Sequence, residues 1–146
     1  MNGPSVVGAF QGRHVMADLY GIDPQLLDDA DRLKSLLENA LVEANATVLQ
    51  TMAHRFTPQG VTVLALLAES HASLHTYPEH DPLEGGACFA DFFTCGPSAN
   101  PEQVLRLLSR GLQPRRQHIS IVDRGLPVPL ARPWHAQFSP LGKASA

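Results

Sequence analysis

The chain has 146 residues, 44% of them hydrophobic and 17% charged, which is ordinary for one folded domain with a moderate core. The formal net charge of −3 gives no electrostatic reason to expect nucleic acid or an anionic membrane surface as a partner. No apolar run approaches the roughly 20 residues of a membrane-spanning helix, and residues 1–11 lack the basic start and apolar centre of a secretion signal. These features favour a cytoplasmic protein.

The first predicted elements are a strand and a long helix. After a loose leader at residues 1–11, residues 13–20 alternate between two sets of side chains, as a strand does. Asp23 followed by Pro24 is typical of a helix start, because aspartate caps the first turn and proline fits its first position. Leucine and alanine then recur at helical spacing as far as Ala44, which predicts one helix over this segment.

The rest of the chain predicts strands, a second helix and a tail. The continuous apolarity of residues 61–68 predicts a strand that is buried on both faces. Residues 57–60 form a turn, residues 80–86 form a loop with a glycine pair, and the second helix starts near Pro101. The remaining predicted segments are strands at 47–56, 73–77, 87–95 and 117–122, and a proline-rich tail at 123–146.

This order of elements predicts an α+β fold, with an antiparallel sheet and both helices on one of its faces. Such a two-layer sandwich leaves the other face of the sheet in need of a cover, which a second copy of the chain would supply. We expect one domain at residues 12–122 whose uncovered sheet face packs against a partner subunit.

The two cysteines, Cys88 and Cys95, lie in one predicted strand at positions that point to opposite faces, so they are not expected to pair. Free thiols fit a reducing compartment. A free cysteine commonly packs as a small hydrophobe, whereas Cys95 stands at a strand end, where functional side chains gather, and both interpretations stay open. Phe56 and Tyr77 also stand at strand ends, where two rings either pack or hold a flat base.

Chemistry-bearing residues gather where the apolar run of 61–68 ends. Residues 66–79 read LLAESHASLHTYPE and combine carboxylates, serines and histidines. In an extended chain, Ser70 and His75 point to opposite faces because their positions differ by an odd number. They can therefore act together only if the chain bends between them, or if the backbone at residue 70 itself reacts.

Two common kinds of site find little support in this segment. The residues around Ser70 do not form Gly-x-Ser-x-Gly, so no hydrolase nucleophile turn is indicated. A metal site would draw on His71, His75, His80 and Glu79. The spacing does not match a helical His-x-x-x-His with its glutamate, which favours surface or structural histidines.

Four short motifs give this part of the chain a family resemblance. In chain order they are Glu69-Ser70-His71, His75-Thr76, Pro78-Glu79 and Phe93-Thr94-Cys95-Gly96. Supporting matches are Gly12-Arg13-His14, His54-Arg55-Phe56 and Gly60-Val61. Together they resemble the bacterial S-adenosylmethionine decarboxylase proenzymes, from about Gly12 to about Leu112.

The resemblance implies a self-cleaving enzyme. The Ser70 hydroxyl would attack the Glu69 carbonyl, and elimination from the resulting ester would leave a pyruvoyl group at position 70. The products would be a β chain, residues 1–69, and an α chain, residues 70–146. The pyruvoyl carbonyl forms a Schiff base with the substrate amine and accepts the electrons released with carbon dioxide, so no metal or external cofactor is implied.

The implied reaction is decarboxylation of S-adenosylmethionine, which supplies aminopropyl groups for spermidine and polyamine synthesis. By position, His75 matches the family's histidine that takes the α-proton during processing, and Thr62 matches a residue that assists it. Cys95 matches the proton donor to the decarboxylated substrate. An imidazole suits proton abstraction because its ordinary pKa, near 6.5, leaves much of it as free base at neutral pH.

The resemblance also implies how substrate binds. Phe56 and Tyr77 match residues that stack on adenine, and Glu79 matches a carboxylate that binds the ribose hydroxyls. The implied assembly is a homodimer, (αβ)2 after cleavage, in which two sheets pack together.

Two segments depart from the family pattern. Residues 80–87 are longer, and the tail matches nothing in it. Because residues 80–87 lie between Glu79 and Cys95, the same chemistry on ornithine or arginine stays open as an alternative. A homologue that does not process and regulates a paralogue is a further alternative, although Ser70, His75 and Cys95 are all present.

Overall fold

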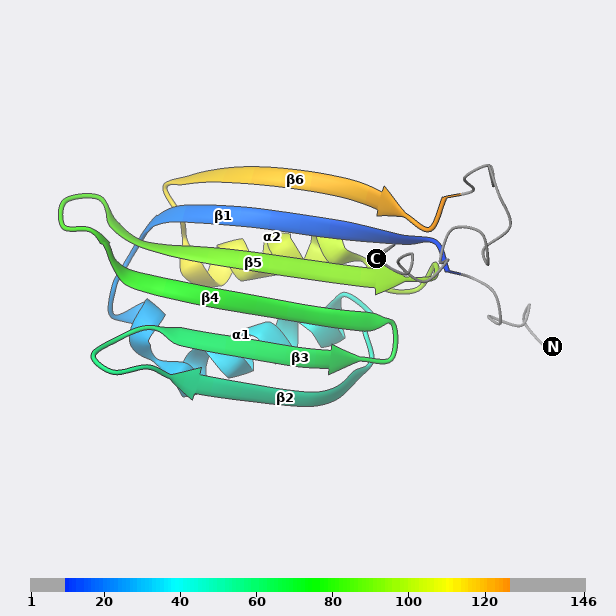
Figure 1. Ribbon diagram of the computed structural model, residues 1–146, viewed down its shortest axis with the longest axis horizontal. Helices are drawn as coiled ribbons and strands as arrows, with labels where there is room; N and C mark the ends of the chain where they lie inside the picture. Colours follow the sequence, from blue (N-terminus) through cyan, green and yellow to red (C-terminus); the bar gives the residue numbers. More distant parts are fainter. Residues whose placement is uncertain (1–9, 127–146) are drawn as a thin grey trace, which may run out of the picture.

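The computed structural model describes residues 10–126, whose strands form one six-stranded antiparallel sheet in the order β2-β3-β4-β5-β1-β6. The strands are β1 (Gly12–Ile22), β2 (Val48–Arg55), β3 (Val61–Leu67), β4 (Ser70–Asp81), β5 (Gly85–Cys95) and β6 (Arg116–Arg124). Both α-helices, α1 (Ala30–Glu43) and α2 (Pro101–Leu112), lie behind the same face of the sheet (Figure 1). The predicted α+β fold is confirmed. Residues 1–9 of the predicted leader and residues 127–146 of the predicted tail lie outside the described residues.

Strand alternation builds the core between the sheet and the helices. Every second side chain of the central strands faces the helices and is buried, as Val15, Ala17 and Leu19 are on β1. The buried helix residues are Leu33, Leu37, Ala40 and Leu41 of α1, and Val104, Leu105, Leu108 and Leu112 of α2. The intervening strand residues point to the opposite side of the sheet, called here the helix-free face.

The prediction that residues 61–68 are buried on both faces is wrong. Every odd-numbered residue of β3 is buried, but Leu64 and Leu66 are 44% and 53% exposed. Both helices pack on one face, so the other half of this apolar run has no second layer against which to bury. An apolar stripe therefore remains open on the helix-free face.

The first α-helix starts later than the sequence predicted from Asp23. Leu26–Asp28 form a short 3-10 helix, η1, and α1 follows it. Asp29 between them is extended, and its carboxylate accepts a hydrogen bond from the Arg32 N–H at 3.0 Å. Asp29, and not Asp23, is therefore the residue that caps α1.

β4 and β5 form one long hairpin. β4 is longer at both ends than the strand predicted at 73–77. The loop predicted at 80–86 is only the short turn between β4 and β5. Asp81 makes this turn because its carboxylate accepts the backbone N–H groups two and three residues further on, at 2.7 and 2.8 Å. These hydrogen bonds hold the pKa of the Asp81 carboxyl below its ordinary value, and the one from the Glu84 N–H has the largest effect. Gly85 follows with a φ of +116°, where a side chain would be strained.

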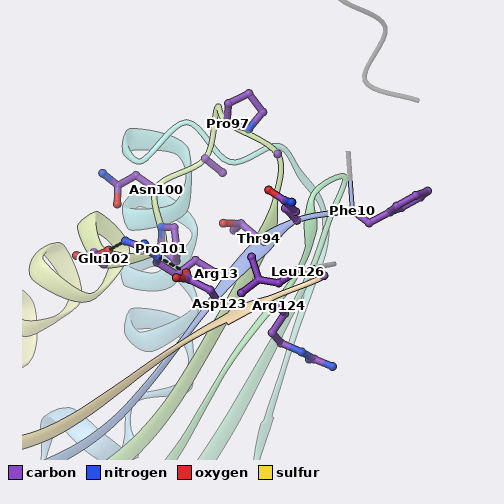
Figure 2. Close-up of a pocket in the computed structure, with 15 residues that line it drawn as sticks. Phe10, Arg13, Thr94, Pro97, Asn100, Pro101, Glu102, Asp123, Arg124 and Leu126 are labelled. Atoms are coloured by element: carbon purple, nitrogen blue, oxygen red, sulfur yellow. Dashed lines mark hydrogen bonds and ion pairs between the residues drawn. The ribbon is translucent and has the colours of Figure 1, made fainter. Parts of the chain in front are cut away.

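β6 continues past its predicted end at residue 122. It pairs with β1 along its whole length, so that Arg124 lies opposite Gly12. Arg13 of β1 forms ion pairs with Asp123 of β6 and with Glu102 at the start of α2 (Figure 2). These contacts join the first strand to the last strand and to α2.

Thr76 is a buried polar residue that joins three segments. Its hydroxyl donates to the Leu27 carbonyl at 2.6 Å and accepts from the Val61 N–H at 2.8 Å. η1 is thereby fixed to the sheet where β3 begins. By contrast, the buried hydroxyl of Thr51 on β2 has no hydrogen-bond partner within residues 10–126.

We expect Thr76→Val to lower the free energy of unfolding by about 1–3 kcal/mol, because two buried backbone groups then lose their partner. The matched change Thr51→Val should be neutral or slightly stabilising, because its hydroxyl is buried without a partner. Urea denaturation followed by circular dichroism measures both effects. Equal losses in the two variants would show that the Thr76 hydrogen bonds contribute nothing specific.

Candidate functional site

The side chains singled out by the sequence lie at two opposite ends of the sheet. The Ser70 end lies where β3 turns into β4 and where β5 finishes. It holds Glu69, Ser70, His71, Phe93 and Cys95. The Phe56 end lies at the turn between β2 and β3. It holds Phe56, Tyr77 and Glu79.

The peptide bond between Glu69 and Ser70 lies in the tight turn from β3 to β4. The Glu69 carbonyl oxygen accepts a hydrogen bond from the Cys95 N–H at 2.9 Å. The Glu69 carboxylate accepts from the N–H and the hydroxyl of Thr47, at 3.0 and 2.9 Å. Ser70 has a φ of +152°, a backbone conformation that costs a residue with a side chain on the order of 1–3 kcal/mol. This peptide is therefore polarised at its carbonyl and held in a strained conformation.

A cavity of about 510 Å³ opens at this turn and brings Ser70 and Cys95 together. Its walls include Phe93 and Arg124. The Arg124 guanidinium lies 4.9 Å from the centre of the Phe93 ring, which holds both side chains in the wall. Ser70 and Cys95 thus line one cavity.

Cys88 and Cys95 are free and lie on opposite faces of β5, as the sequence predicted. Cys88 is fully buried beneath the helices, and burial raises the pKa of its thiol to about 12. Cys95 is only partly buried and lines the cavity. The two thiols therefore differ in their access to solvent and reagents.

His71 contacts the Ser70 side chain directly. Its Nδ1 lies 3.1 Å from Ser70 Oγ. The His71 ring also packs edge-on against Phe93, with 5.9 Å between ring centres. A histidine nitrogen therefore faces the hydroxyl that stands next to the strained peptide bond.

His75 does not reach Ser70 within one chain. Its Nδ1 lies 3.0 Å from Thr62 Oγ1, which stands opposite it on β3. Ser70 lies five positions away along β4, a distance of roughly 16 Å at the rise of a strand. The structure therefore brings His75 and Thr62, each expected to take part in processing, into contact with one another and separates both from Ser70.

The Phe56 end presents exposed aromatic rings. Phe56 is 47% exposed and Tyr77 is 40% exposed. The Tyr77 ring lies 5.1 Å from Phe89, and the Phe56 ring lies 4.6 Å from His54. Tyr77 is seven positions from Ser70 on β4, roughly 23 Å, so these residues also stand apart from Ser70 of their own chain.

Asp28 fixes the turn that carries Phe56. Its carboxylate accepts the Gly60 N–H at 2.9 Å and forms an ion pair with Arg55. The hydrogen bond from Gly60, followed by that from Arg55, lowers the pKa of the Asp28 carboxyl. The exposed ring of Phe56 is thus held on a braced turn.

His14 and Asp91 form a polar pair that the sequence analysis did not single out. His14 Nε2 lies 2.8 Å from Asp91 Oδ1, and the His14 ring centre lies 6.3 Å from that of His71. Alternation places both residues on the helix-free face, but only the register of β1 against β5 brings them together.

The metal alternative gains no support. His71, His75 and His80 are spread along β4, and within residues 10–126 no three His, Cys, Asp or Glu side chains are grouped so that they could hold a metal ion. Among the helices of the same residues, none is long and apolar enough to cross a membrane.

A second cavity, of about 770 Å³, lies on the helix side of the same end of the sheet (Figure 2). Arg13, Glu102 and Asp123 line it with their ion pairs. Thr94 and Gly96, which flank Cys95, belong to its wall. This cavity adjoins the one that holds Ser70, because Phe10, Arg124 and Gly125 line both.

A family model described as S-adenosylmethionine decarboxylase matches residues 13–125. The chain belongs to this family. S-adenosylmethionine decarboxylase proenzymes of Prochlorococcus marinus (strain MIT 9313) and Brevibacillus brevis are each 42% identical to it, over 82% and 79% of this chain and 92% and 83% of their own. The crystal structure of the adenosylmethionine decarboxylase from Aquifex aeolicus VF5 superposes with a TM-score of 0.73 at 32% identity, covering 86% of this chain and 100% of that one. The family resemblance predicted from the motifs is confirmed.

We expect iodoacetamide at pH 8 to modify Cys95 and to leave Cys88 unmodified in the folded protein. Cys95 lines an open cavity, whereas Cys88 is fully buried with a pKa of about 12 and stays protonated. Peptide mass spectrometry measures the site, and Cys95→Ser should leave the folded protein unmodified. Unfolding in urea should expose both thiols. Modification of Cys88 before unfolding would contradict this assignment.

Proposed function

We propose that this chain is a self-processing S-adenosylmethionine decarboxylase that depends on a pyruvoyl group formed from Ser70. The observation that carries this proposal is the strained Glu69–Ser70 peptide, whose carbonyl accepts the Cys95 N–H at the cavity that also contains the Cys95 side chain. Membership of a family whose relatives are described as proenzymes supports it.

Self-cleavage would make and break bonds of this chain alone, with water as the only other reactant. Ser70 Oγ bonds to the Glu69 carbonyl carbon, the Cys95 N–H stabilises the oxyanion, and the peptide C–N bond breaks to leave an ester. Removal of the Ser70 α-proton then expels the Glu69 carboxylate and leaves dehydroalanine. Hydrolysis releases ammonia and leaves pyruvoyl at position 70. The products are residues 1–69 and 70–146.

The residues of the cavity fit a small carbonyl group at position 70. Such a group supplies the electron sink that decarboxylation of an amino acid requires. Cys95 lines the same cavity, and its thiol would donate a proton to the substrate carbon after carbon dioxide leaves. Phe93 and Arg124 form part of the cavity wall.

The proposed active form is a homodimer in which each site takes residues from two chains. Within one chain, His75 and Thr62 lie too far from Ser70 to act on it. A two-fold axis that packs the helix-free faces together, with the Phe56 end of one copy over the Ser70 end of the other, removes this separation. The exposed Leu64 and Leu66 give such an interface apolar contacts. After cleavage the assembly is (αβ)2.

The same arrangement supplies a binding site for S-adenosylmethionine. Phe56 and Tyr77 offer exposed rings for the adenine, and Glu79 offers a carboxylate for the ribose hydroxyls. These residues act at the Ser70 of the second copy. The free thiols of Cys88 and Cys95 are consistent with the cytoplasm as the compartment.

We expect the purified protein to consist of two fragments, separated between Glu69 and Ser70. Intact-mass spectrometry under denaturing conditions measures the cut, and Edman sequencing of the larger fragment should be blocked because pyruvoyl has no amine. Ser70→Ala should give one whole chain, because it removes the attacking oxygen.

A wild-type chain that stays whole would contradict the proposed function. Once cleavage is established, release of carbon dioxide from S-adenosylmethionine, ornithine and arginine identifies the substrate. Turnover of ornithine or arginine in place of S-adenosylmethionine would retain the pyruvoyl chemistry and reject the nucleoside substrate.

We expect two inactive variants to restore cleavage when they are produced together. His75→Ala retains Ser70, and Ser70→Ala retains His75, so a mixed dimer contains one complete processing site. Different affinity tags allow mass spectrometry to show that only the His75→Ala chain is cut. As the matched control, the double variant Ser70→Ala/His75→Ala should not rescue His75→Ala. No cleavage in the first mixture would mean that each site uses residues of a single chain.

A further inference from the structure

Self-cleavage at Ser70, on which this inference rests, requires the removal of protons from two different atoms. The first proton leaves Ser70 Oγ as that oxygen attacks the Glu69 carbonyl. The second leaves the Ser70 α-carbon when the ester is eliminated. A serine hydroxyl is a weak nucleophile until an adjacent base takes its proton, so the first step needs a base within hydrogen-bond reach of Oγ.

His71 meets the geometric requirement for that first base. Its Nδ1 lies 3.1 Å from Ser70 Oγ, within the same chain. His75, which the family resemblance matches to the histidine that takes the α-proton, lies roughly 16 Å away along β4 and would act in the site of the second copy. The two proton removals therefore fall to two histidines that approach residue 70 from different chains.

The surroundings of His71 hold its ring in place. The ring packs edge-on against Phe93, at 5.9 Å, and lies 6.3 Å from the ring of His14. His14 is itself held by Asp91 through the 2.8 Å contact at its Nε2. The exposed His71 ring thus lies beside side chains of two other strands of the sheet, β5 and β1.

The Glu69 carbonyl, which Oγ attacks, is polarised by a hydrogen bond at the same turn. The Cys95 N–H donates to the Glu69 carbonyl oxygen at 2.9 Å, where negative charge develops when Oγ attacks. Nucleophile, base and oxyanion donor are therefore all present within one chain. What a second copy would add is the base for the later elimination.

We propose that His71 is the general base of the first step, the conversion of the Glu69–Ser70 peptide into an ester. The neutral ring accepts the Oγ proton at Nδ1 while the bond from Oγ to the Glu69 carbonyl carbon forms. When the C–N bond breaks, the same proton passes from Nδ1 to the Ser70 nitrogen. His71 ends the step neutral, so no other acid, base or oxidant is consumed.

The test follows cleavage of the full chain from the time of its synthesis. Wild type, His71→Asn, His71→Ala, His75→Ala and the matched control His118→Asn are made by cell-free translation and sampled over time. His118 is an exposed histidine on β6 that takes no part in either proposed site. Circular dichroism and sedimentation show which variants keep the fold and the assembly. If His71→Ala does not fold, the proposal is tested with His71→Asn alone.

Hydroxylamine separates the two steps because it splits an ester and leaves a peptide intact. We expect His71→Asn and His71→Ala to slow cleavage by about 10²–10⁴-fold, the usual contribution of a general base, and to resist hydroxylamine. His75→Ala should also remain uncut but should be split by hydroxylamine between Glu69 and Ser70, because it forms the ester and cannot eliminate it. Added imidazole should speed cleavage of His71→Ala, whereas His118→Asn should match wild type.

Cleavage of folded His71→Asn or His71→Ala at the wild-type rate would overturn the proposal. So would an uncut His71 variant that hydroxylamine splits, because the ester would then form without His71. A wild-type chain that never cleaves would overturn the proposed function itself. The proposal is supported if the His71 variants keep the fold and process slowly, and if their uncut chains resist hydroxylamine.

Discussion

A β-strand turns successive side chains to opposite faces, and in this molecule α1 and α2 cover only one of those faces. The remaining features depend on this constraint. The side chains on the covered face form an apolar core with both helices. Those on the helix-free face stay within reach of solvent and of a partner, so polar and aromatic groups can be kept there without a cost in burial. The same alternation makes Cys88 a core residue and leaves Cys95 at a cavity.

The length of β4 separates the groups that the chemistry must combine. A strand is a rigid spacer, so Ser70 at its start cannot approach His75 or Tyr77 further along it. The short-range contacts at the Ser70 end, from His71 and from the Cys95 N–H, serve the formation of the ester. The distant groups become useful only when a second sheet lies over the first in the opposite direction. Elimination and substrate binding would then be properties of the dimer.

Much of the fold follows from periodicity, and much of the site follows from motifs. The strand positions and the opposite faces of Cys88 and Cys95 depend on a period of two, which a sequence displays directly. The sequence of one strand does not show whether helices cover one face of the sheet or both, so it does not predict the exposure of Leu66. Asp23 accepts the Gln25 N–H just before η1, and Asp29, after η1, caps α1, so the helix-start pattern at Asp23 does not mark the start of α1. The contact of His14 with Asp91 joins residues 77 positions apart, and it depends on a strand register that no local pattern encodes.

The order of strands has a consequence for a chain that is cut after Glu69. One piece would contain β1, β2, β3 and α1, and the other would contain β4, β5, β6 and α2. β1 lies between β5 and β6, and β3 lies beside β4, so backbone ladders join the pieces in three places (Figure 1). The pieces are interlocked, and neither could leave without opening the sheet. Loss of one covalent bond would free two chain ends at the cavity while the architecture around them stayed whole.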